Sequence, residues 1–156
     1  MSLFPARSAL GPVFAAAIFV ACLSAAPAIA ADAIGQIKTV SGAVAIERAD
    51  DTTQAVIGDS VYQQDVIRTG PDGKVGITFV DLSMFSAGPG TELKLERFRF
   101  NRTTHDGVFE SRIRRGSLSG VSGRIAANNP DAMKIRTYSA ILGVRGTKFV
   151  IEVEGH

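Results

Sequence analysis

The pattern that most constrains the fold of this 156-residue chain is the alternation of apolar and polar residues in short runs, each ended by Gly, Asp, Asn or Pro. Successive side chains of a β-strand point to opposite faces, so this alternation is typical of strands with one buried and one wet face. Beyond residue 30 there is almost no helical periodicity. The pattern therefore predicts an all-β domain. The runs are residues 40–47, 74–79, 92–96, 109–114 and 148–154.

The apolar positions of two stretches change from odd to even numbers, after Phe79 and again between Leu95 and Phe98. Because the side-chain period of a strand is two, each change predicts a corner, a bulge or a switch of sheet. Many short strands with corners favour a compact roll over a flat sheet. The even-numbered apolar residues are Val80, Leu82, Met84, Phe98 and Phe100.

Turn residues separate the runs. Asp72-Gly73 and Asp106-Gly107 are the best candidates for hairpin turns, because Asp-Gly suits the positive φ angles that such turns need. The stretch 119–131 is rich in Gly, Ser, Ala and Asn, which predicts a surface loop or a poorly packed pair of strands.

Residues 1–30 have the features of a targeting segment. Arg7 precedes an apolar run from Val13 to Ala26, and Pro27 is followed by small residues that suit cleavage after Ala30. We therefore expect a signal-peptide helix at 1–30, a β domain at 31–156, and a periplasmic protein. An uncleaved anchor, or lipidation at Cys22, is the alternative that would bring the chain to a membrane.

Composition limits the chemistry of the exported domain. Cys22 is the only cysteine, so residues 31–156 contain no disulfide and no thiolate metal site. Loss of Arg7 leaves 16 basic and 15 acidic residues, a balance that gives no field to attract nucleic acid. We expect no nucleic-acid partner.

Two separated stretches resemble the FecR domain, a bacterial periplasmic module. The first runs from Gly58 to Thr69 and on to the turn Asp81-Leu82-Ser83, and the second is Gly143-Val144-Arg145-Gly146-Thr147 with the strand that follows. The resemblance extends over about Gly35–Val153. It favours a β-solenoid-like roll, with a β-sandwich as the alternative. The matching positions, which we interpret as structural, are Asp65, Thr69, Asp81, Ser83, Gly143, Arg145, Gly146 and Thr147.

The residue types at these positions suggest their roles. Gly143 and Gly146 would permit a tight corner or a close backbone approach, and Arg145 would bind carbonyls or a buried carboxylate such as Asp65 or Asp81. The family usually has Asp-Gly-Ser where this chain has Leu82, and Leu does not easily adopt a positive φ. We therefore expect an ordinary corner there, with Asp81 and the serine after Leu82 capping backbone amides.

A group of arginines interleaves with Phe98 and Phe100. If residues 109–115 pair with residues 93–102, these arginines share one outer face and form a basic strip for an envelope polymer, anionic lipid or protein. The alternative is a solvated face balanced by acidic residues across the ladder. The strip consists of Arg97, Arg99, Arg102, Arg112 and Arg114, and the balancing acids are Glu92, Glu96 and Glu110.

No set of residues predicts catalysis. The two histidines, His105 and His156, have no partner at metal-ligand spacing, so we expect no metal, no cofactor and no enzyme activity. The resemblance implies a module like the periplasmic part of iron-linked cell-surface signalling regulators, which binds or relays to an envelope protein. A polysaccharide-binding module is the alternative, although the chain has no Trp and only Tyr62 and Tyr138 as tyrosines.

Overall fold

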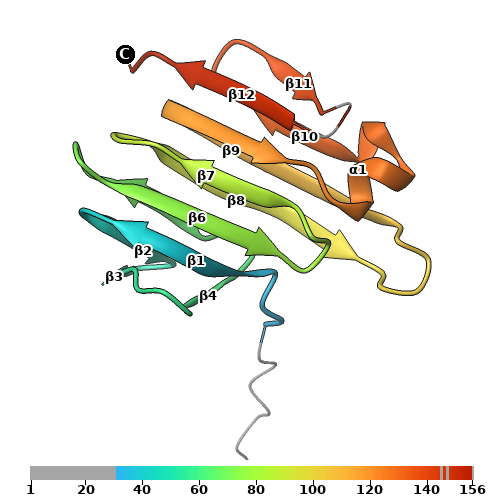
Figure 1. Ribbon diagram of the computed structural model, residues 1–156, viewed down its shortest axis with the longest axis horizontal. Coiled ribbons are helices and arrows are strands. Elements are labelled where there is room, and N and C mark those ends of the chain that lie inside the picture. The colour runs from blue at the N-terminus through green and yellow to red at the C-terminus, as the bar shows by residue number, and fades with distance from the viewer. Residues whose placement is uncertain (1–30, 145, 147, 156) are drawn as a thin grey trace, which may run out of the picture. The chain divides into compact units, whose positions relative to one another are not determined.

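The computed structural model describes residues 31–144, 146 and 148–155. The predicted signal peptide, and with it the cleavage position, lies outside these residues. Twelve of the 14 helices and strands in this part are strands, so the structure is mostly β, as the alternation predicted (Figure 1). The elements are β1 (Gly35–Ser41), β2 (Val44–Arg48), β3 (Asp51–Gln54), β4 (Ser60–Val61), β5 (Val66–Thr69), β6 (Lys74–Phe79), β7 (Met84–Ala87), β8 (Glu92–Phe100), β9 (Gly107–Val121), α1 (Arg124–Asn128), the 3-10 turn η1 (Pro130–Ala132), β10 (Met133–Arg136), β11 (Ile141–Gly143) and β12 (Lys148–Val153).

The strands form one sheet that curls into a half-barrel. We call its two halves sheet A, with strand order β4-β1-β6-β7-β9-β12, and sheet B, with strand order β3-β2-β5-β8-β9-β10-β11. Each of the segments 35–48, 66–79, 84–100 and 107–121 passes through both halves, and neighbouring segments run antiparallel. The core of the sheet is thus a four-membered antiparallel meander, folded across its middle.

The fold line is a row of glycine-containing corners. Gly70 N–H donates to Ala43 C=O at 2.8 Å, and Gly90 N–H donates to Gly70 C=O at 2.9 Å, so neighbouring corners are bonded to each other. Gly116 bends β9 from sheet B into sheet A with a φ of 90°, and a Cβ atom there would lie 2.3 Å from Thr91 Oγ1. Only glycine fits such a position without displacing its neighbour.

One of the two predicted hairpins is confirmed. Residues 101–106 connect β8 and β9, which pair directly. The prediction for Asp72-Gly73 was wrong, because it connects β5 to β6, and these strands lie in different halves and do not pair. Asp72-Gly73 instead forms part of the corner at which the chain passes from β5 in sheet B to β6 in sheet A.

The core lies between the inner faces of the two halves. Phe79 and Phe85 from sheet A meet Phe98 and Phe109 from sheet B, with Phe79–Phe109 ring centroids 4.6 Å apart. Aromatic pairs at this separation add to the stabilisation that burial provides. Fully buried aliphatic residues surround these rings, including Ile37, Ile77, Leu118, Ile67, Leu93 and Ile113.

The two predicted changes of parity had different outcomes. A register shift between Leu95 and Arg97 moves Phe98 to the inner face, which confirms the second change. At the first, the predicted corner exists, because the chain turns between β6 and β7, but the parity does not change: Asp81, Ser83 and Phe85 continue the odd-numbered inner positions, whereas Leu82 is exposed. The inner positions are occupied there by the polar residues Asp81 and Ser83, so the apolar pattern in the sequence is interrupted although the strand faces do not change.

Two further expectations need correction. A solenoid stacks its strands in parallel, but among the described residues only β9 and β10 pair in parallel and the remaining pairs are antiparallel. The stretch 119–131 is not a loose loop, since it contains the end of β9 and the helix α1, whose Ile125 is fully buried. Arg124 N–H donates to Asp81 C=O at 2.8 Å and joins the helix to the β6–β7 turn. No helix among the described residues is long and apolar enough to cross a bilayer.

Candidate binding surface

Asp65 is a buried carboxylate that joins β2 to the start of β5. Its two oxygens accept hydrogen bonds from Nε and Nη2 of Arg48, both at 2.8 Å, and one of them also accepts from Tyr62 N–H at 2.8 Å. The hydrogen bonds to Asp65 raise the pKa of Arg48 above its ordinary value, so its charge is permanent. The Arg48 guanidinium also lies 4.3 Å from the centre of the Tyr62 ring. Both carboxylate oxygens are thus bound within the protein, and the side chain is fully buried.

The expected partner of this carboxylate was Arg145, which lies outside the described residues, as does Thr147. Arg48 was missed because it is 17 residues away from Asp65 and becomes its neighbour only when β2 pairs with β5. Its place at the end of an alternating run, next to Asp50 and Asp51, indicated no more than a turn.

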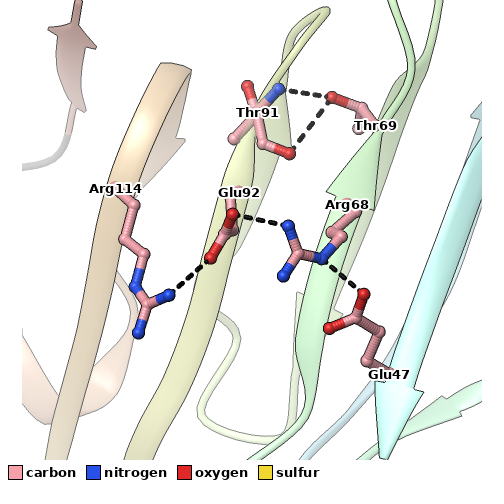
Figure 2. A network of polar contacts seen from close by, with 6 residues as sticks. All are labelled: Glu47, Arg68, Thr69, Thr91, Glu92 and Arg114. Atoms are coloured by element: carbon pink, nitrogen blue, oxygen red, sulfur yellow. Dashed lines mark hydrogen bonds and ion pairs between the residues drawn. The ribbon is translucent and has the colours of Figure 1, made fainter. Parts of the chain in front are cut away.

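Thr69 secures the fold line between the two halves. Its hydroxyl donates to Gly88 C=O at 2.6 Å. It also accepts from Thr91 N–H at 2.7 Å, as Figure 2 shows. Thr91 Oγ1 in turn exchanges hydrogen bonds with the backbone of Ser117, at 3.0 Å in each direction. The two hydroxyls thus satisfy backbone groups at two neighbouring corners, Gly88 and Thr91 between β7 and β8 and Ser117 beside Gly116.

Asp81 and Ser83 close the turn between β6 and β7, and both are fully buried. Asp81 accepts from Ser83 N–H at 3.0 Å and from its hydroxyl at 2.7 Å, and Ser83 Oγ accepts from Gly123 N–H at 2.8 Å. Contrary to expectation, Leu82 adopts a positive φ of 69° with its side chain 54% exposed. The turn keeps the glycine-type backbone without the glycine, at a cost of about 1–2 kcal/mol for a residue with a Cβ atom.

Gly143 and Gly146, the two glycines of the second stretch that resembles the FecR domain, differ in backbone conformation. Gly146 has a positive φ of 103°, the backbone that favours glycine. Gly143 does not, and a Cβ atom on it would meet nothing within 4 Å. The expected close backbone approach is therefore absent at Gly143, which is the exposed last residue of β11.

The outer face of sheet B carries a lattice of ion pairs. Glu92 contacts Arg68 at 2.6 Å on one side and Arg114 at 3.0 Å on the other, and Arg68 continues to Glu47 at 2.5 Å (Figure 2). The contact with Glu47 raises the pKa of Arg68. A second group joins Glu96 and Glu110 to Arg97, Arg112 and Arg136, at 2.7–4.0 Å. Most charges on this face are thus neutralised by the protein itself.

The predicted arginine strip divides into two parts. The pairing of β8 with β9 places its strand arginines on one face, but Arg112 and Arg114 are bound by Glu96 and Glu92. Arg97 reaches Glu110 only at 4.0 Å. Within the described residues, Arg99 and Arg102 form no ion pair; both line a depression beside residues 31–34. The strip is therefore not a continuous basic surface.

In the described part of the chain, no three His, Cys, Asp or Glu residues gather in a way that could hold a metal ion. His105 has a positive φ of 60°, stacks on Phe100, and places Nε2 3.0 Å from Arg124 Nη1. That nitrogen faces a donor and so accepts the hydrogen bond. These contacts fix the β8–β9 loop on α1.

The outer face of sheet A differs in composition. A shallow groove crosses it from β1 to β12, and no carboxylate lines it. Its middle row consists of Gly76, Ser86 and Ser119, which lie side by side on β6, β7 and β9. Met84 and Val150 border this row with 49% and 74% of their surface exposed. The middle of this groove presents small and apolar groups, and its two charged residues, Lys38 and Lys148, lie at its ends.

The two long margins of the sheet also differ. At one margin, β3 contains only Asp, Thr and Gln and β4 has two residues, features that discourage pairing with another chain. At the other margin, β12 pairs only with β9, and β11 pairs only with β10, among the described strands. Ile141 of β11 and Val150 of β12 are 62% and 74% exposed. We call β11 and β12 together the open edge.

Comparison with known proteins gives one result. The model of the FecR protein family matches residues 65–156, more than half of the chain. No curated protein and no solved structure matches. The matched range begins at the buried Asp65 and includes the β6–β7 turn, the corners at Gly88 and Gly116, and the open edge. The chain therefore belongs to the FecR protein family.

Proposed function

We propose that this protein is an exported, non-catalytic FecR module that binds another protein of the cell envelope, or relays a signal to it, through the open edge. Membership of a regulatory family supports a binding role over a catalytic one. Export to the periplasm after cleavage behind Ala30 is part of the proposal. It is tested by the mass of the protein recovered from the periplasm, which should begin at Ala31.

The observation that carries the proposal is the difference between the two margins. An unpaired strand offers a row of N–H and C=O groups to an extended segment of a partner, and pockets or apolar side chains beside it provide selectivity. β12 is six residues long and combines this free margin with the exposed side chain of Val150. Among the described strands, β3 and β4 are also unpaired on their outer sides, but they are only four and two residues long and carry no exposed apolar side chain.

In-cell crosslinking tests this assignment. A photoreactive residue at Val150 or Ile141 should capture one envelope protein, whereas the same residue at Thr53 of β3 should capture none. Val150 and Thr53 are both exposed strand positions, so the pair is matched. Equal capture at all three positions, or none at the open edge, would refute the assignment.

The polysaccharide alternative has less support. Sugar sites usually present several exposed aromatic rings, whereas the ring of Tyr62 is covered by Arg48 and Tyr138 is the one exposed tyrosine of the chain. Calorimetry with purified envelope glycan separates the two functions, because the proposal expects no heat of binding.

A further inference from the structure

We infer that the partner reaches the outer face of sheet A with an extended segment in which two carboxylates flank aliphatic side chains. The inference rests on the proposed function, because it describes the chemistry of the protein that binds at the open edge. The groove and the edge are continuous, since Lys148 and Val150 of β12 belong to both.

Charge is the first argument. Lys38 lies at the β1 end of the groove and Lys148 at the β12 end, and both side chains are exposed. Lys38 donates a hydrogen bond to Gln36, a neutral partner. Neither lysine forms an ion pair with any described residue, although most charges on sheet B are paired. Because no carboxylate lines the groove, a segment that carries them would supply the missing partners.

The floor of the groove supplies the second argument. Gly76 has no side chain to fill the groove, and a Cβ atom there would lie 2.4 Å from Thr39 Oγ1. Ser86 and Ser119 continue the row with short side chains. Met84 and Val121 form the neighbouring row on β7 and β9. A strip of small residues bordered by aliphatic ones accommodates aliphatic side chains better than charged ones, since burial of apolar surface is favourable and burial of an unpaired charge is not.

The spacing of the two lysines sets the length of the segment. Lys38 lies on β1 and Lys148 on β12, and the strand order from one to the other is β1-β6-β7-β9-β12. Four strand spacings of about 4.8 Å give about 19 Å, the length of about six extended residues. Residues separated by six positions in an extended chain point to the same side. The expected pattern is therefore Glu-Ser-Val-Ser-Val-Ser-Glu, with both acids and both valines toward the groove.

A defined peptide tests the inference on the intact exported protein. A fluorescent peptide containing Glu-Ser-Val-Ser-Val-Ser-Glu should bind and shift the amide resonances of Gly76, Ser86 and Ser119. A peptide with Lys in place of both Glu should bind at least tenfold more weakly, and the difference should shrink at high salt. No resonance shift at millimolar peptide, or equal affinity for the two peptides, would overturn the inference.

Charge exchange provides the matched control. The double variant Lys38→Glu/Lys148→Glu should reverse the preference and bind the Lys peptide more tightly. Lys94→Glu/Lys134→Glu makes the same change in charge on the outer side of sheet B and should leave the preference unchanged. If both double variants act alike, only the net charge matters and the groove is not the site.

Two other occupants are outcomes of the same experiments. Vesicles of anionic phospholipid that bind the protein and release it on Lys38→Glu/Lys148→Glu would assign the face to a membrane. A dimer in light scattering that blocks the peptide would assign it to a second copy. Either result overturns the inference. Capture of a protein at Val150 in cells would still support the proposed function, so the two failures are distinguishable.

Discussion

The two outer faces of the folded sheet use polar residues in opposite ways. On sheet B, acids and arginines on neighbouring strands neutralise each other, and Glu92 and Glu96 each contact two arginines. On sheet A, the groove is lined by small and apolar residues with a lysine at each end and no acid. Most charged groups of sheet B are already paired within the protein, whereas the lysines and apolar side chains of sheet A are accessible to a partner.

The long strand β9 contributes residues to both outer faces and shows the same difference along its own length. Before Gly116 it contributes Arg112 and Arg114 to the lattice of sheet B, and after Gly116 it contributes Ser119 and Val121 to the groove of sheet A. Gly116, which bends the strand, therefore marks the boundary between the face whose charges are paired within the protein and the face that carries the groove. The contrast predicts that polar substitutions on the sheet B side cost stability and that comparable ones on sheet A do not.

The largest effect is expected at Asp65, the buried carboxylate of the sheet B side. Asp65→Ala removes both acceptors of Arg48 and the acceptor of Tyr62 N–H, which should lower the free energy of unfolding by about 3 kcal/mol. Urea denaturation measures the change, and Asp50→Ala in an exposed turn is the control, expected within about 0.5 kcal/mol of the parent. Equal losses in the two variants would show that Asp65 is not an anchor.

A smaller effect is expected at Glu92, in the middle of the lattice. Glu92→Ala leaves Arg68 and Arg114 without their shared acid, and we expect a loss of about 1–2 kcal/mol, since its side chain is only 10% exposed. Glu152→Ala is the matched change on sheet A, at an exposed position of β12 without an ion pair to any described residue, and should change stability by less than about 0.5 kcal/mol. If Glu152→Ala costs as much as Glu92→Ala, the contrast between the faces is wrong.

The smallest effect concerns the β6–β7 turn of sheet A and has the opposite sign. Leu82→Gly removes a Cβ atom from a residue with a φ of 69° and should raise the free energy of unfolding by about 1 kcal/mol, net of the greater freedom of glycine in the unfolded chain. Thermal denaturation measures the gain. Met84→Gly, two residues away in a strand, should destabilise instead, and a loss of stability in both variants would mean that Leu82 is held by contacts of its own.

Much of the fold could be predicted because its strands follow local rules. The alternation at 74–79 and 148–154 became β6 and β12, and the parity change after Leu95 became a bulge. The errors fell where polar residues occupy inner positions. Asp81 and Ser83 interrupt the hydrophobic pattern without leaving the core, and the buried Ile125 lies in a stretch too rich in small residues to indicate a helix.

The sequence by itself determined the all-β class, the family and the absence of cysteine chemistry from residues 31–156, because these depend on residue types and on neighbours in the chain. The tertiary structure alone decided that Arg48 binds Asp65 and that Lys38 and Lys148 border a groove without acids, and it chose between two alternatives for the arginines, which Glu92 and Glu96 bind. These contacts join residues that are 16 or more positions apart. Such residues meet only because segments of the meander pair side by side, β2 with β5 and β8 with β9, and this pairing joins residues that are far apart in the chain.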